Sequence, residues 1–98
     1  MNELEINLAL AKATGWDKKD MRVREGYLEL NTLWHGYKTW MVFQYWRPTV
    51  IWPIAAKYDY FPARDGCGQW LSGKYPYDVA DSPVLAVAMA VINGAKKC

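Results

Sequence analysis

The feature of the sequence that most constrains its fold is a short apolar segment near the C-terminal end. Asp81-Ser82-Pro83 is a typical helix start, because a capping side chain stands before a proline at the first helical position. No charged side chain follows until Lys96. A helix that is apolar nearly all round has to be buried. The sequence therefore predicts a closing helix from Pro83, ended by Asn93-Gly94, inside one domain that spans residues 1–98.

A second helix is predicted at the other end of the chain, over residues 2–14. Asn2 has a capping side chain, and Glu5 follows at the spacing of a capping box. Apolar side chains recur at helical spacing along this segment, at Leu4, Leu8 and Ala11. Gly15 ends the helix, since glycine readily takes the left-handed conformation found after a last helical turn.

Between the two helices the pattern favours strands. Residues 21–24 and 27–30 alternate around Glu25-Gly26, which is typical of a hairpin with a two-residue turn. Residues 31–36 are expected to form a loop or a second turn. Residues 37–46 are rich in aromatic and β-branched side chains and predict a strand that is apolar on both faces.

The next segment, residues 50–61, is expected to be a further strand, with Pro53 at its start, at a bulge or at an edge. Residues 62–68 form a turn around Asp65-Gly66, residues 69–72 a short strand, and residues 73–80 a loop. The predicted fold class is therefore α+β: a small antiparallel β-sheet with an N-terminal and a C-terminal helix packed on it.

Composition narrows the class of protein. Hydrophobic residues make up 52% of the chain and charged residues 22%, which excludes a disordered segment. Twelve basic and ten acidic residues give a net charge of only +2, and a dominant basic surface for tracking phosphates is not indicated.

Location is inferred from the absence of targeting signals. The sequence holds no apolar run of transmembrane length and no signal-peptide pattern at its start. A cytoplasmic protein without a membrane partner is expected, with Cys67 and Cys98 reduced. A Cys67–Cys98 disulfide is the alternative.

The residues that carry chemistry are sparse. His35 is the only histidine, and a thiolate–imidazole pair with Cys67 is one reading; a turn histidine and an ordinary thiol are the other. A zinc site needs about four ligands, and the two cysteines and one histidine are dispersed. No phosphate-binding loop is present. The sequence predicts a protein that is not an enzyme and has no cofactor and no metal.

Aromatic residues are the unusual resource of this chain. Six tryptophans and seven tyrosines exceed what a core of this size needs, so some rings should be exposed. Exposed aromatic rings serve as contact residues at protein interfaces or as stacking platforms for single-stranded nucleic acid. The candidate binding residues are the aromatic and cationic side chains of the second half: Trp46, Arg47, Tyr58, Tyr60, Arg64 and Trp70.

Three segments resemble small accessory proteins of tailed phages, namely the NinX-like and phage ABA sandwich families. They are the opening helix that ends in Gly15-Trp16, the segment that begins Trp52-Pro53-Ile54 and leads to Gln69-Trp70, and the closing helix from Asp81 to Met89. The resemblance implies a sheet with helices packed on it and a phage or prophage origin. It transfers no catalytic residue.

These observations together predict a non-enzymatic, phage-type accessory protein that binds a host or phage protein and acts as an inhibitor of a host system. Its location would then be the host cell cytoplasm. The alternative is a single-stranded nucleic-acid-binding protein that uses exposed Trp and Tyr with scattered Lys and Arg. A homo-oligomer is a further alternative, because an uncovered aromatic edge strand favours pairing.

Overall fold

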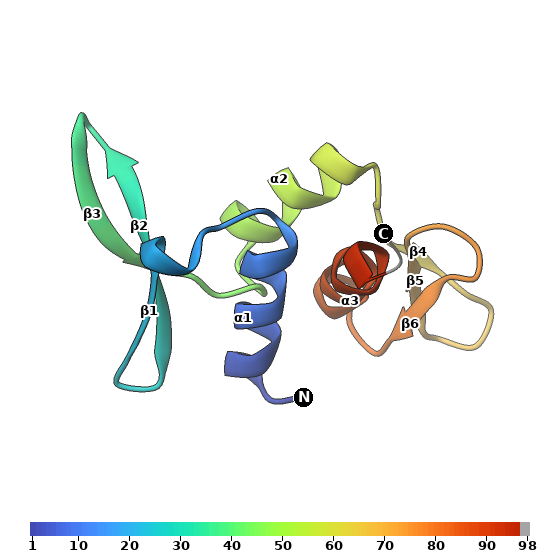
Figure 1. Ribbon diagram of the computed structural model, residues 1–98. Coiled ribbons are helices and arrows are strands. Elements are labelled where there is room, and N and C mark those ends of the chain that lie inside the picture. Colours follow the sequence, from blue (N-terminus) through green and yellow to red (C-terminus); the bar gives the residue numbers. More distant parts are fainter. Residues whose placement is uncertain (97–98) are drawn as a thin grey trace. The chain divides into compact units, whose positions relative to one another are not determined.

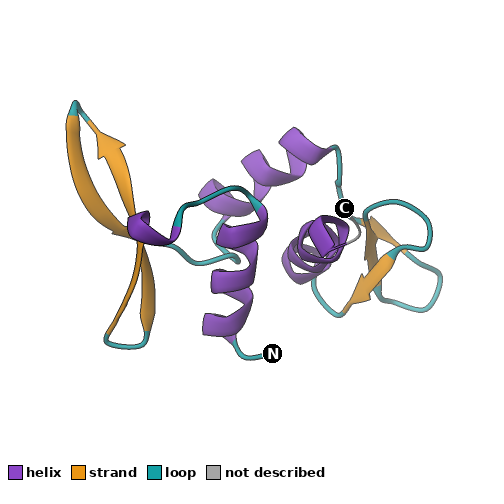
Figure 2. Ribbon diagram, viewed as in Figure 1, coloured by secondary structure: helices purple, strands orange, loops and turns teal. Residues whose placement is uncertain are grey.

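The computed structural model describes residues 1–96 and has the predicted α+β class (Figures 1 and 2). It divides into two compact units, an N-terminal unit of Met1–Gln44 and a C-terminal unit that begins at Tyr45. Each unit contains one three-stranded antiparallel sheet, so two small sheets replace the single predicted one. That the whole chain is one domain stays a prediction.

The N-terminal unit opens with helix α1 (Glu3–Ala13), as the capping box predicts. The Asn2 side chain accepts a hydrogen bond from the Glu5 N–H at 2.8 Å, and the Glu5 carboxylate accepts one from the Asn2 N–H at 3.2 Å. Gly15 has a φ of +96°, the left-handed conformation expected of it. A short 3-10 helix, η1 (Lys18–Asp20), then leads into the sheet.

The sheet of this unit has the order β1-β2-β3, with β2 in the centre. The strands are β1 (Met21–Arg24), β2 (Tyr27–Trp34) and β3 (Tyr37–Val42). Glu25-Gly26 forms the predicted hairpin turn with φ of +54° and +80°. Leu28 and Leu30 on β2 are buried, and α1 contacts this strand. The Glu25-Gly26 turn and the antiparallel pairing of β1 with β2 confirm the predicted hairpin.

Two predictions for this sheet are wrong in their bounds. Residues 31–36 were expected to be a loop or a second turn; the turn forms at His35-Gly36, with φ of +49° and +84°, but the residues before it continue β2 to Trp34. His-Gly supplies the same pair of positive φ angles as Glu-Gly. β3 ends at Val42 rather than at residue 46, although the Phe43 N–H still donates to the Leu28 carbonyl at 2.8 Å.

The largest difference from the predicted secondary structure lies at the start of the C-terminal unit. Residues 50–61, expected to be a strand, lie mostly in helix α2 (Pro48–Tyr58). Pro48 stands at the start of the helix rather than breaking a strand, and Pro53 is tolerated inside it. Ile51 and Ala55, four residues apart, form the buried stripe. Asp59 ends the helix with a φ of +58°, so an aspartate takes the position usually given to glycine.

The second sheet has the order β4-β5-β6: β4 (Ala63–Arg64), β5 (Trp70–Ser72) and β6 (Asp78–Ala80). β5 confirms the predicted short strand, whereas β6 lies inside the predicted loop 73–80. Helix α3 (Pro83–Lys96) contacts β5, β6 and α2.

Helix α3 is as buried as its composition requires. The Leu85 N–H donates to the Ser82 hydroxyl at 3.1 Å, which confirms the predicted start. Buried side chains lie all round it: Ala86, Val87, Ala88, Ala90, Val91 and Ile92. The predicted end at Asn93-Gly94 is wrong, because the helix runs on to Lys96. Gly94 instead lets a side chain approach, since a Cβ there would meet the Tyr60 hydroxyl oxygen at 3.4 Å.

Leu28 should be the residue on which the N-terminal unit depends most. Its side chain is fully buried on the central strand. Leu28→Ala should lower the free energy of unfolding by about 2 to 5 kcal/mol, from lost burial and the cavity left behind. Denaturant unfolding checks this. Leu33→Ala is the control, because Leu33 is 70% exposed on the same strand; equal losses for the two variants would contradict the assigned core.

Gly73 should be the least replaceable glycine. It has a φ of +95°, and a Cβ there would meet the Ala90 Cβ at 3.0 Å. Gly73→Ala should destabilise the chain by about 1 to 3 kcal/mol through backbone strain and the clash with α3. Gly66→Ala is the matched control, since a Cβ at Gly66 meets nothing within 4 Å. Thermal unfolding of both variants distinguishes them, and an unchanged Gly73→Ala would refute this close approach.

Candidate binding surface

All six candidate residues lie in the C-terminal unit, and they form two groups. Trp46 and Arg47 stand immediately before α2, with the Arg47 Cζ 5.6 Å from the centre of the indole ring. Trp46 is 44% exposed, so part of its ring reaches the surface. Since α2 has 11 residues, its length of about 16 Å separates this pair from the residues at the other end of the helix.

The second group gathers where α2 ends. The rings of Tyr58 and Tyr60 are 6.0 Å apart, and the Lys57 Nζ lies 5.7 Å from the centre of the Tyr58 ring. The Tyr60 carbonyl accepts a hydrogen bond from the buried Ser72 hydroxyl at 2.7 Å. This bond joins the end of α2 to strand β5, which carries Trp70 two residues earlier.

Arg64 and Trp70 face each other across the β4–β5 ladder. The Arg64 Cζ is 5.7 Å from the centre of the Trp70 ring, and a guanidinium over an indole is a favourable contact. Arg64 itself is exposed, whereas Trp70 is half-buried. The pair therefore presents a cation with an aromatic ring beneath it.

The turn between these strands fixes that pairing. One carboxylate oxygen of Asp65 accepts hydrogen bonds from the N–H groups of Cys67 and Gln69, at 2.8 and 2.9 Å. The Asp65 N–H donates to the Gln69 carbonyl at 2.9 Å and closes the loop. Cys67 is exposed in this turn, and Cys98, its partner in the alternative disulfide, lies outside the described residues. His35, the partner of Cys67 in the catalytic reading, belongs to the β2–β3 turn of the N-terminal unit.

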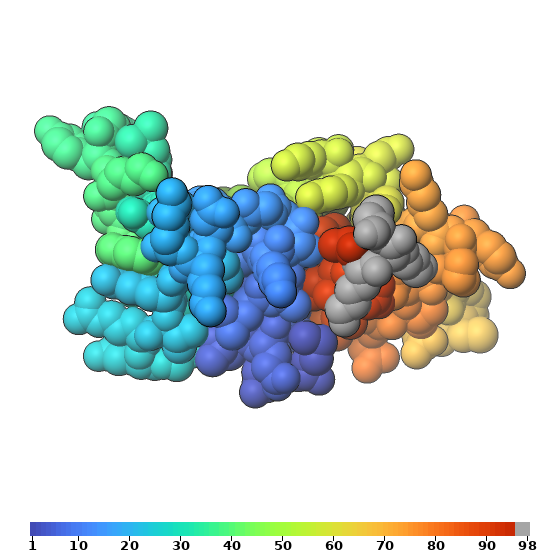
Figure 3. Space-filling model, in the orientation of Figure 1, coloured from blue at the N-terminus to red at the C-terminus, as the bar shows by residue number. Residues whose placement is uncertain are grey.

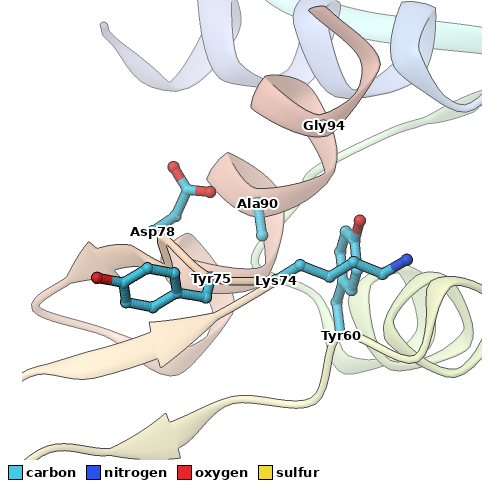
Figure 4. Close-up of a pocket in the computed structure, with 6 residues that line it drawn as sticks. All are labelled: Tyr60, Lys74, Tyr75, Asp78, Ala90 and Gly94. Carbon is cyan, nitrogen blue, oxygen red and sulfur yellow. The ribbon is translucent and has the colours of Figure 1, made fainter. Parts of the chain in front are cut away.

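A small pocket completes the surface (Figure 4). It has a volume of about 180 Å³ and lies beside the loop between β5 and β6. Its lining residues are Tyr60, Lys74, Tyr75, Asp78, Ala90 and Gly94. Lys74 extends toward Tyr60, and the ring of Tyr75 lies on the side of Asp78 (Figure 4). The two small residues of α3 leave the space that the larger side chains surround.

Charge in the pocket is uneven. Asp78 accepts a hydrogen bond from the Asn93 side chain, so its carboxylate is already engaged. Tyr75 is 85% exposed and packs edge-on against Tyr77, with ring centres 6.0 Å apart. Lys74 is exposed at the rim. The pocket therefore offers one cation and two phenol groups to whatever enters it.

Sequence reasoning found one of the six pocket residues, Tyr60, and missed the rest. Residues 73–80 were predicted to be a loop, and none of them was among the candidate binding residues. The usable signal was the run Lys74-Tyr75-Pro76-Tyr77, in which two aromatic rings flank a proline. A cationic and aromatic cluster in a loop is a better marker of a contact surface than rings inside a predicted strand.

No metal-binding cluster of three or more His, Cys, Asp or Glu side chains occurs among residues 1–96. None of the helices in this range has the length and apolar character needed to cross a membrane. Comparison of the chain with protein-family models, with curated proteins and with solved structures finds no match.

Asp65 should control the order of the β4–β5 turn. Asp65→Ala removes the acceptor of two backbone hydrogen bonds, and the expected loss is about 1 to 2 kcal/mol because these bonds are exposed to water. Hydrogen exchange of the Cys67 and Gln69 amides should accelerate in the variant. Asp17→Ala is the control, since Asp17 makes no side-chain capping bond. Unchanged exchange at both amides would show that the carboxylate does not hold the turn.

Proposed function

We propose that this chain is a non-enzymatic accessory protein of phage type that acts by binding a host or phage protein through its C-terminal unit. The observation that carries the proposal is the pocket lined by Tyr60, Lys74 and Tyr75, with the tyrosine ring of Tyr75 exposed beside it. Interfaces draw most of their affinity from a few aromatic and arginine residues near a pocket that takes one anchor side chain.

The size of the pocket favours a protein partner over a small molecule. Sites that enclose small molecules have volumes of roughly 300 to 1,000 Å³. At about 180 Å³, this pocket is suited to one side chain of a larger partner. Lys74 at its rim favours an anchor that brings a carboxylate or a carbonyl oxygen. Tyr75 and Tyr77, at 85% and 51% exposure, would supply rigid apolar contact area around that anchor.

Inhibition of a host system is the outcome we expect of such binding, in the host cell cytoplasm. A chain of this size inhibits by covering a surface that its partner needs for its own contacts. The phage-type assignment rests on the resemblance of the opening helix, the Trp52-Pro53-Ile54 segment and the closing helix. It predicts that the gene lies among phage genes.

Single-stranded nucleic acid is the second candidate, favoured by the cation–aromatic pairs Arg47–Trp46, Lys57–Tyr58 and Arg64–Trp70. The same contacts also count against base stacking, because in each pair the cation already lies over the ring onto which a base would stack. Asp59 and Asp65 also interrupt the positive charge along this surface. These two features favour the protein partner.

Tyr75→Ala should remove most of the affinity for the partner. The full chain serves as bait in a host lysate, the captured protein is identified by mass spectrometry, and its Kd is measured with purified components. We expect Tyr75→Ala to weaken binding at least tenfold, in the range of interface anchors. Tyr27→Ala, at 51% exposure in the N-terminal unit, should change the Kd less than twofold.

Two results would contradict this proposal. One is the absence of any reproducible partner. The other is a partner whose Kd is unchanged by Tyr75→Ala. A rise in affinity for a single-stranded oligonucleotide as salt is lowered, followed by tryptophan fluorescence, would favour the second candidate instead.

A further inference from the structure

A second surface of the chain lies on the hairpin β2–β3 and is independent of the proposed function. β1 pairs with residues Tyr27 to Leu30 only, so β2 and β3 extend beyond it as a two-stranded arm (Figure 1). In the space-filling view the end of this arm stands clear of the side chains of β1 (Figure 3). Its aromatic residues Trp34 and Tyr37 are 56% and 77% exposed.

The outer edge of the arm is strand β3, the edge strand of its sheet. The bond from the Phe43 N–H to the Leu28 carbonyl, together with the register of the ladder, shows which residues of β3 direct their backbone N–H and C=O groups toward β2. In an antiparallel ladder these alternate with residues whose N–H and C=O groups point outward. The outward residues are therefore Lys38, Trp40 and Val42, and the described part of the chain places no further strand beside them.

We propose that β3 pairs in antiparallel fashion with β3 of a second copy of this chain, with Trp40 opposite Trp40 on the two-fold axis. This register sets Lys38 opposite Val42 of the other copy and joins outward residues only. In each copy the three outward residues contribute one donor and one acceptor each, so the new ladder between the two copies holds about six hydrogen bonds. The two sheets become one continuous six-stranded sheet.

Charge complementarity supports this register over its neighbours. On β2, Glu29 stands beside Val42 and on the same face. Lys38 of one copy would thus lie two strands, about 10 Å, from Glu29 of the other, a span that the two side chains bridge together. Glu29 is held in place by an ion pair with Arg22 at 2.7 Å. Arg22 in turn lies 4.3 Å from the centre of the Trp40 ring.

The edge otherwise lacks the devices that keep edge strands apart. Residues 37–42 contain no proline, and their pairing with β2 is continuous, without a bulge. Lysine on an edge strand commonly discourages pairing. Here the single lysine gains an opposite charge from the second copy. Pairing would also stabilise the arm, because a two-stranded sheet has little stability alone and the dimer adds strands beside it.

Oligomeric state is the first test, on the full chain by analytical ultracentrifugation over a concentration series. We expect a reversible dimer. Lys38→Glu should raise the dimer Kd at least tenfold, because it opposes Glu29 of the other copy. Lys19→Glu makes the same charge change on exposed η1 and should leave the Kd within twofold. A chain that stays monomeric, or a dimer indifferent to Lys38→Glu, would overturn the proposal.

Register is the second test. In a chain with Cys67→Ser and Cys98→Ser, the variants Thr39→Cys and Met41→Cys are prepared separately. The proposed register sets residue 39 of one copy opposite residue 41 of the other, so a disulfide should form when the two variants are mixed. Neither variant alone should form one. The absence of a cross-link in the mixture, with folding confirmed by circular dichroism, would refute this pairing.

Discussion

The close approach of helix α3 to the second sheet is the contact on which the rest of the C-terminal unit depends. Gly73 lies so near Ala90 that a side chain would touch it, and Gly94 leaves room for the Tyr60 hydroxyl. Small residues at these positions bring the backbone of α3 close to the β5–β6 loop. Ala90 and Gly94 also line the pocket, where their small size leaves its space open. Packing and recognition therefore come from one arrangement.

This arrangement separates two kinds of aromatic residue. Trp70 and Tyr60 are held by the framework, one by the Arg64 guanidinium and the ladder, the other by the bond between its carbonyl and Ser72. Tyr75 and Tyr77 lie in the loop between β5 and β6, pack edge-on against each other and are 85% and 51% exposed. The first kind belongs to the framework of the unit, and the second leaves aromatic surface open for contact with a partner.

Helix starts and tight turns were predictable from the sequence because their causes are local. The Asn2–Glu5 capping box, the Ser82-Pro83 start and the Glu25-Gly26 turn all form as expected. Helix α2 was not, because its residues alternate from Ile54 and include a proline that suggests a strand edge. The buried pair Ile51 and Ala55 decides the matter, and burial is a tertiary property. The pocket could not be predicted for the same reason, since its lining residues are spread along the sequence from Tyr60 to Gly94.

The two-residue turn at His35-Gly36 has a consequence for how this fold can vary. Side chains alternate between the faces of a strand, so losing or gaining one residue in β2 would exchange its faces. Adding two residues to each strand beyond β1 avoids this and keeps the hydrogen-bonding pattern at the turn. Such an addition would move the tip outward by about 7 Å without touching Leu28 or Leu30. The reach of the arm is thus a dimension that evolution can alter separately from the core, by lengthening or shortening the hairpin two residue pairs at a time.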